Sequence, residues 1–151
     1  MTIYRQKDIM GRDAFNKDFP TQFITAGTQD DYDPIDMFLT AKTNPDRTYS
    51  VEVKIIGREY AKFIWRGKDY GFQIDAKKID ALWDKWITEG RIPILYIKFD
   101  DCTLVWDIRK IDYKSRERLV ETNDDGCNYG KSKSSSLQTY LYKNEAVWTK
   151  E

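Results

Sequence analysis

Residues 48–56 show the most regular alternation of hydrophobic and polar positions in the chain. Val51 and Val53 fall on one face of the predicted strand by its two-residue period, and Glu52 and Lys54 fall on the other. Burying an acid or a base is costly unless the group is paired or binds a metal ion. The segment is therefore either an edge strand with a solvated ion pair or a strand that carries a functional site.

A second pattern, with helical spacing, covers residues 75–89. Asp75 can cap the helix at its start, and Gly90 can end it. Apolar residues recur at intervals of three and four, which predicts a helix with one face packed on a sheet. They are Ile79, Leu82, Trp83, Trp86 and Ile87. We expect Trp83 and Trp86 in the hydrophobic core.

The remaining β-prone runs predict further strands, joined mostly by tight turns. These runs are residues 35–40, 60–65, 70–74, 92–99 and 103–108. The first 19 residues predict one or two short helices interrupted near Gly11. Residues 123–136, rich in Gly, Ser and Asn, predict a loop, and residues 137–142 and 146–148 predict additional strand. The expected fold is α/β, with a central mixed β-sheet flanked by helices.

Composition supports a folded chain and limits its chemistry. The 151 residues fit a single domain, residues 1–151, and 40% of them are hydrophobic. Basic and acidic residues balance at 25 each, so a polyanion would have to be held by a local patch or through cations. Histidine is absent, which excludes His-dependent hydrolysis and His-ligated zinc. The remaining side chains offer oxygen ligands, which suit a hard ion such as Mg²⁺ or Mn²⁺.

Cys102 and Cys127 do not form a CxxC motif, and the start of the chain does not resemble a secretion signal. No apolar run approaches the roughly 20 residues that cross a bilayer. We therefore expect reduced thiols, a cytoplasmic location and no membrane partner.

The predicted hairpin of residues 35–40 and 48–56 would bring Asp36 beside Glu52 and Lys54. Asp33 is the alternative acid at this position. Asp36 is preferred because a strand begins directly after it, whereas Asp33 precedes a proline and suits a turn.

The order of these elements is similar to that of the PD-(D/E)XK nuclease superfamily, which has the restriction-endonuclease-like fold and includes Holliday-junction-resolvase-like proteins. Pro34-Ile35-Asp36, the Glu52-Val53-Lys54 strand and Gln73 before the long helix resemble the motifs of that superfamily. The resemblance implies an αβββαβ core. An acidic residue often found in the family's first helix has no clear counterpart here, which leaves open whether one or two metal ions bind.

The resemblance also implies a metal-dependent endonuclease or exonuclease. Asp36, Glu52 and the carbonyl of Val53 would hold Mg²⁺ or Mn²⁺, and Lys54 would orient the attacking water or stabilise charge on the phosphate. Gln73 is a further candidate ligand or water-positioning group. Two alternatives are a catalytically silent copy of the fold, or an unrelated α/β module, that binds nucleic acid or protein. In a third alternative, Glu52 and Lys54 simply pair with each other in a structural protein.

The expected partner is nucleic acid, with DNA the first choice and RNA open. Lys131 and Lys133, together with a basic segment between Arg109 and Arg118, could contact phosphates, although a solvated charged face is the favoured explanation. A homodimer is a candidate arrangement, because cutting both strands of a duplex commonly calls for two active sites.

Overall fold

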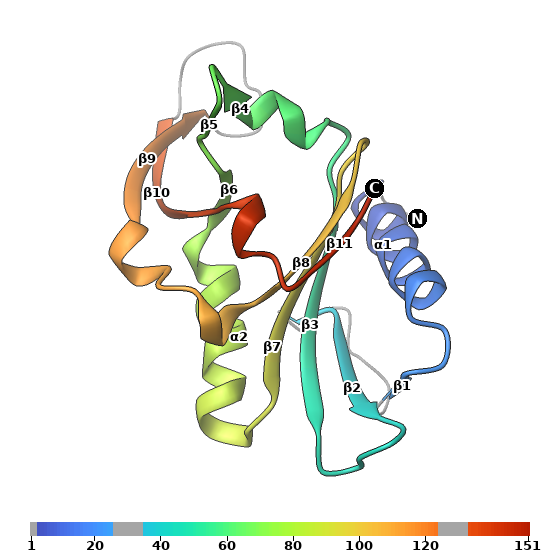
Figure 1. Cartoon of the computed structure of the whole chain (residues 1–151). Coiled ribbons are helices and arrows are strands. Elements are labelled where there is room, and N and C mark those ends of the chain that lie inside the picture. Colours follow the sequence, from blue (N-terminus) through green and yellow to red (C-terminus); the bar gives the residue numbers. More distant parts are fainter. Residues whose placement is uncertain (1–2, 26–34, 124–132) are drawn as a thin grey trace.

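The computed structural model describes residues 3–25, 35–123 and 133–151. Its main sheet has six strands in the order β1-β2-β3-β7-β8-β11 (Figure 1). Their bounds are β1 (Phe23–Thr25), β2 (Met37–Ala41), β3 (Thr48–Ile55), β7 (Ile92–Lys98), β8 (Thr103–Asp107) and β11 (Trp148–Lys150). Strands β3 and β7 run parallel, and the other neighbours are antiparallel. The predicted mixed sheet is therefore confirmed.

Helix α1 (Ile3–Asp18) packs on one face of this sheet and α2 (Ala76–Glu89) on the other (Figure 1). Separate hydrophobic clusters fill the two interfaces. The α1 side gathers Phe15, Met37, Leu39, Val51, Val53, Tyr96 and Val105. The α2 side is larger and includes Ile79, Leu82, Leu95, Ile97 and Trp106. The sheet is thus covered on both faces, as the α/β prediction requires.

Gly11 does not interrupt α1, contrary to the expectation of a break there. The helix runs through it without interruption for 16 residues. A Cβ atom at Gly11 would stand only 3.1 Å from Val53 Cγ2, which is tighter than ordinary packing. Glycine at this position therefore lets the helix approach β3 closely, and this contact offsets its low helix propensity.

Helix α2 has the predicted caps. The Asp75 side chain accepts a hydrogen bond from the Lys77 N–H at 3.0 Å, and Gly90 takes the left-handed conformation with φ 69°. Its core-facing residues differ from the prediction. Ile79 and Leu82 are fully buried, whereas Trp83 and Trp86 are only partly buried and Ile87 is 65% exposed. Trp83 packs against the core cluster that contains Ile79 and Leu82, as predicted, but from its edge. The buried face of the helix is therefore narrower than the sequence spacing indicated.

The predicted strand over residues 60–65 is wrong for its first four residues, which form a 3₁₀ helix (Tyr60–Phe63). The backbone N–H groups of Tyr60 and Ala61 donate to the Asp101 carboxylate at 2.6 and 3.2 Å, so they are unavailable for strand pairing. A short hairpin follows, formed by β4 (Ile64–Trp65) and β5 (Lys68–Asp69).

A second sheet contains β6 (Phe72–Asp75), β10 (Lys133–Leu141) and β9 (Arg118–Asn123), in that order. The predicted loop over residues 123–136 is therefore wrong at its end, because residues 133–136 pair with β9. Residues 124–132 lie outside the described residues. Ladder pairing overrides the weak β propensity of the serines in this segment.

In the parts of the chain that the structure describes, three more 3₁₀ helices connect the remaining elements. They are Ile108–Lys110, Lys114–Arg116 and Lys143–Glu145. Of the helices in the described parts of the chain, none is both long enough and apolar enough to cross a bilayer.

Candidate functional site

The two faces of β3 differ as the alternation predicted. Val51 and Val53 are 1% and 3% exposed and pack in the cluster beneath α1. Glu52 points to the α2 side and is also buried, with 5% exposure. Glu52 is therefore not a solvated residue of an edge strand. It lies inside a sheet, between neighbours β2 and β7.

Asp36 directly precedes β2 and lies across from Glu52. Met37 pairs with Val51, and the antiparallel register continued by one residue brings Asp36 opposite Glu52. The Asp36 carboxylate accepts a hydrogen bond from the Val53 N–H, with 3.0 Å between Oδ2 and N. This bond fixes the side chain against β3. The structure thus brings the two predicted carboxylates together on one face of the sheet.

Glu52 has an unfavourable environment for a negative charge. Its pKa is raised from 4.5 to about 8, first because burial disfavours the carboxylate and second because the charge of Asp36 lies beside it. A protonated Glu52 can donate a hydrogen bond to Asp36, which favours the neutral form further. The arrangement holds two acids in one place without enough positive charge to keep both ionised.

Two lysines partly oppose this effect. Lys54 lies on the same face of β3 as Glu52, and its charge lowers the pKa of that acid. Lys78 on α2 places its Nζ atom 3.7 Å from Glu52 Oε1 and remains 44% exposed at its side chain. Lys78 was missed from the sequence. Its spacing of four residues from the buried Leu82 was a usable signal, because such a pair shares one face of a helix.

Gln73 lies apart from this cluster, on β6 of the second sheet. Phe72 and Ile74 beside it turn into the core, so the Gln73 side chain is exposed on the other face. Within the described part of the chain, no hydrogen bond or ion pair joins Gln73 to Asp36 or Glu52. Its catalytic role stays a prediction.

The other predicted residues are placed only in part. Asp33, the alternative first acid, lies outside the described residues, as does Lys131. Lys133 begins β10, which fixes the position of its backbone. The carbonyl of Val53 remains a predicted ligand, and its N–H group is the one bonded to Asp36.

Much of the basic segment between Arg109 and Arg118 serves intramolecular contacts. Arg109 pairs with Asp107 at 2.7 Å and lies over the Trp86 ring. Arg116 pairs with the Glu145 carboxylate through both of its terminal nitrogens. Bidentate pairs of this kind are held by geometry as well as charge. These arginines therefore brace the fold, which weakens their assignment as phosphate ligands.

The donor set at the carboxylate pair suits a hard divalent cation. Carboxylate and carbonyl oxygens are the ligands that Mg²⁺ and Mn²⁺ prefer. In the described residues, no group of three or more acidic or sulfur side chains is arranged so that it could hold a metal ion, so protein carboxylates could supply two ligands here. Mg²⁺ commonly keeps several waters and binds through one or two carboxylates, which matches a pair.

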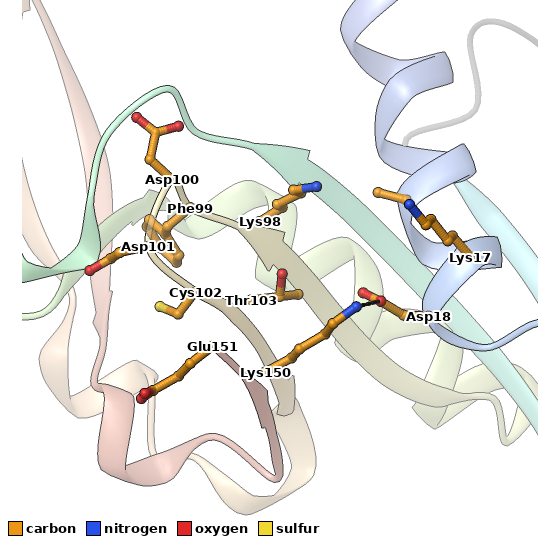
Figure 2. Close-up of a pocket in the computed structure, with 11 residues that line it drawn as sticks. Lys17, Asp18, Lys98, Phe99, Asp100, Asp101, Cys102, Thr103, Lys150 and Glu151 are labelled. Atoms are coloured by element: carbon orange, nitrogen blue, oxygen red, sulfur yellow. Dashed lines mark hydrogen bonds and ion pairs between the residues drawn. The ribbon is translucent and has the colours of Figure 1, made fainter.

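A polar cavity of about 210 Å³ lies on the α1 side of the sheet. Figure 2 shows Lys17, Lys98 and Lys150 around it, with Lys150 bonded to Asp18 at 2.8 Å. Four acids, Asp18, Asp100, Asp101 and Glu151, line the same space. The mixed charges give no preference for an anion or a cation, so this cavity is the weaker candidate.

Comparison with protein-family models, with curated proteins and with solved structures gives no match for this chain. The functional assignment therefore depends on the residues and their geometry.

Proposed function

We propose that this protein is a metal-dependent nuclease that hydrolyses phosphodiester bonds in nucleic acid, with DNA as the first candidate substrate. The observation that carries the proposal is the adjacent pair Asp36 and Glu52, where burial and like charge raise the pKa of Glu52 to about 8. Two acids forced together in this way need a positive partner to ionise. A divalent cation would meet that need.

Asp36 and Glu52 would hold the ion, Mg²⁺ or Mn²⁺, together with the carbonyl of Val53. When bound, the ion supplies Lewis acidity toward the phosphate and its attacking water. The Val53 N–H donates its hydrogen bond to Asp36 Oδ2, so the other carboxylate oxygen, Oδ1, does not take part in that bond. The site therefore keeps acceptor capacity on both acids.

The two lysines have separate roles in this proposal. Lys54 projects beside Glu52 and stabilises negative charge that develops on the phosphate or orients the attacking water. Lys78 lies against Glu52 and favours its ionised form. Because Lys78 is 44% exposed at its side chain, it can also approach a phosphate at the surface.

A restriction-endonuclease-like core is part of the proposal. It is supported by the parallel pair β3 and β7 joined through α2, and by α1 on the opposite face. The location of Asp36 directly before β2, and of Glu52 and Lys54 on β3, also supports it.

The test is cleavage of labelled single-stranded DNA, duplex DNA, junction DNA and RNA with Mg²⁺ or Mn²⁺, and again with EDTA. We expect metal-dependent cleavage of at least one substrate, which Asp36→Asn and Glu52→Gln abolish. Asp33→Asn is the matched control and should reduce cleavage far less than Asp36→Asn. Binding of nucleic acid without cleavage by the wild type would favour the silent binding module, and full activity in Glu52→Gln would contradict the proposed site.

A further inference from the structure

The β4–β5 hairpin is a compact unit with a tight two-residue turn. Ile64 pairs with Asp69 and Trp65 with Lys68, so Arg66 and Gly67 form the turn. Their φ angles are 51° and 75°, both in the left-handed region. Such turns match the twist of hairpin strands but strain a non-glycine residue. Arg66 therefore occupies a conformation that the local structure must hold.

Asp69 anchors one face of the hairpin to the body of the protein. Its carboxylate accepts hydrogen bonds from the hydroxyl of Tyr60 at 2.8 and 2.9 Å and from the Gly71 N–H at 2.8 Å. The Lys143 N–H adds a third donor at 3.1 Å. Tyr60 is fully buried, so this network fixes the hairpin to the core. These hydrogen bonds hold the hairpin in one conformation before any partner binds.

The opposite face carries exposed aromatic rings with cations above them. Trp65 is 60% exposed and Tyr70 is 50% exposed. The Arg66 guanidinium carbon lies 4.4 Å from the centroid of the Trp65 ring, and Lys68 Nζ lies 4.9 Å from the centroid of Tyr70. A single exposed ring is common on protein surfaces, but here two exposed rings share one face of the hairpin and each is combined with a positive charge.

The hairpin stands at the end of the sheet where β3 and β7 finish (Figure 1). The 3₁₀ helix before it begins five residues after β3 ends, and Phe63 in that helix packs on Phe99, one residue beyond β7. Lys54 is the penultimate residue of β3. The hairpin therefore lies at the same end of the sheet as the proposed catalytic lysine.

We propose that Trp65 and Tyr70 stack on unpaired bases of the nucleic acid while Arg66 and Lys68 contact its phosphates. This inference rests on the proposed nuclease function and names its substrate class, single-stranded or locally unpaired nucleic acid. Residues 57–70 contain four basic and two acidic residues, and one of the acids, Asp69, is turned inward. The hairpin is thus a local basic patch on a chain with no net charge.

The combination favours nucleic acid over other occupants. Base faces stack on aromatic rings whatever their sequence, and adjacent cations follow the backbone. Bases within a duplex already stack on one another, so the rings find free faces only where the strands separate. Ring exposure on a rigid hairpin therefore predicts a preference for single strands over an intact duplex.

The experiment measures fluorescence anisotropy of labelled oligothymidylate of about 12 nucleotides, and of its duplex with oligoadenylate, in EDTA. We expect the single strand to bind more tightly than the duplex. Trp65→Ala should weaken single-strand binding by roughly 5- to 150-fold, the range for loss of one stacked base. Tyr70→Ala should act in the same direction. Because both side chains are at least half exposed, circular dichroism should show unchanged folding.

Ile87→Ala is the matched control, since Ile87 is 65% exposed on α2, outside the hairpin. The affinity of Ile87→Ala for the single strand should stay within about twofold of that of wild type. Three results would overturn the inference. The first is equal affinity of Trp65→Ala and wild type for the single strand, and the second is tighter binding to the duplex. The third is Trp65-dependent binding to anionic phosphatidylserine vesicles in place of the oligonucleotide.

The outcomes separate this inference from the nuclease proposal. Binding is measured without metal, and Glu52→Gln should bind the single strand at least as well as wild type because it removes a negative charge. Trp65-dependent binding without any metal-dependent cleavage would retain the hairpin's role and reject the nuclease. Metal-dependent cleavage with no effect of Trp65→Ala on binding would retain the nuclease proposal and reject the role of the hairpin.

Discussion

Two carboxylates on opposite sides of the main sheet have side chains with little exposure, yet their pKa values are shifted in opposite directions. The side chains of Asp18 and Glu52 are 8% and 6% exposed. Burial raises the pKa of each acid. At Asp18, hydrogen bonds from Lys150 and Tyr96 outweigh burial, and the pKa falls below its ordinary 3.8. At Glu52 the nearest group is another acid, and the pKa rises to about 8.

The difference shows how each acid is satisfied. Asp18 accepts from the Tyr96 hydroxyl at 2.5 Å and from Lys150 at 2.8 Å, so the protein itself stabilises its charge. Among the described residues, Glu52 forms one ion pair, with Lys78 at 3.7 Å, and the charge of Asp36 opposes it. A buried acid with complete partners has a structural role, whereas one with an acidic neighbour is a candidate to bind a cation.

After the loss of cleavage expected for Asp36→Asn and Glu52→Gln, the largest expected effect concerns Lys54 on the polar face of β3. Lys54→Ala should reduce the cleavage step by roughly 100-fold or more, the loss expected for one positioned transition-state contact. Single-turnover kinetics with Mn²⁺ measure this step. The free energy of unfolding should change little, because Lys54 is only partly buried. Undiminished cleavage in this variant would place the chemistry elsewhere.

The next effect concerns Asp18 and depends on pH. Asp18→Asn should lower the free energy of unfolding by about 1.5 to 3 kcal/mol at neutral pH, through weaker hydrogen bonds to Tyr96 and Lys150. Because the folded-state pKa is lowered, the charge stabilises the fold above pH 3.8, and this contribution is lost as pH falls through the lower value. Urea unfolding of wild type and Asp18→Asn at several pH values measures the difference between their free energies of unfolding. We expect this difference to become smaller in acid. A difference that does not change with pH would contradict the role of the Asp18 charge.

The smallest effect is that of the matched substitution at Glu52 on stability without metal. Glu52→Gln should change the free energy of unfolding by less than about 1 kcal/mol in metal-free buffer, because a neutral amide replaces an acid that has an acidic neighbour. The same urea experiment at neutral pH compares it with Asp18→Asn. A loss as large as that of Asp18→Asn would show that Glu52 is a structural residue.

The sequence predicted the parts of the fold that depend on local periodicity. The alternation around Glu52 fixed the two faces of β3, and the caps at Asp75 and Gly90 fixed the ends of α2. Asp36 could be placed beside Glu52 because a hairpin register needs only a strand pair and a turn.

The errors arose where distant contacts decide the structure. Tyr60 has strand-like neighbours, but the carboxylate that binds its N–H belongs to Asp101, 41 residues away. Gly11 resembles a helix breaker until its approach to Val53 is known. Lys78 shares a helix face with Leu82, but it belongs to no motif, and its partner Glu52 lies on another element. Such pairings depend on tertiary structure and leave little trace in local sequence.

The central claim is that Asp36 and Glu52 together hold a divalent cation, and thermal melting in Mn²⁺ tests it most directly. At about 100 times its Kd, one bound ion adds about 2.7 kcal/mol to the free energy of unfolding, a rise of roughly 5 to 10 °C in Tm for a domain of this size. We predict this rise for wild type, Lys54→Ala and the control Asp18→Asn, and its loss in Asp36→Asn and Glu52→Gln. No rise in wild type, or an equal rise in Glu52→Gln, would contradict the account.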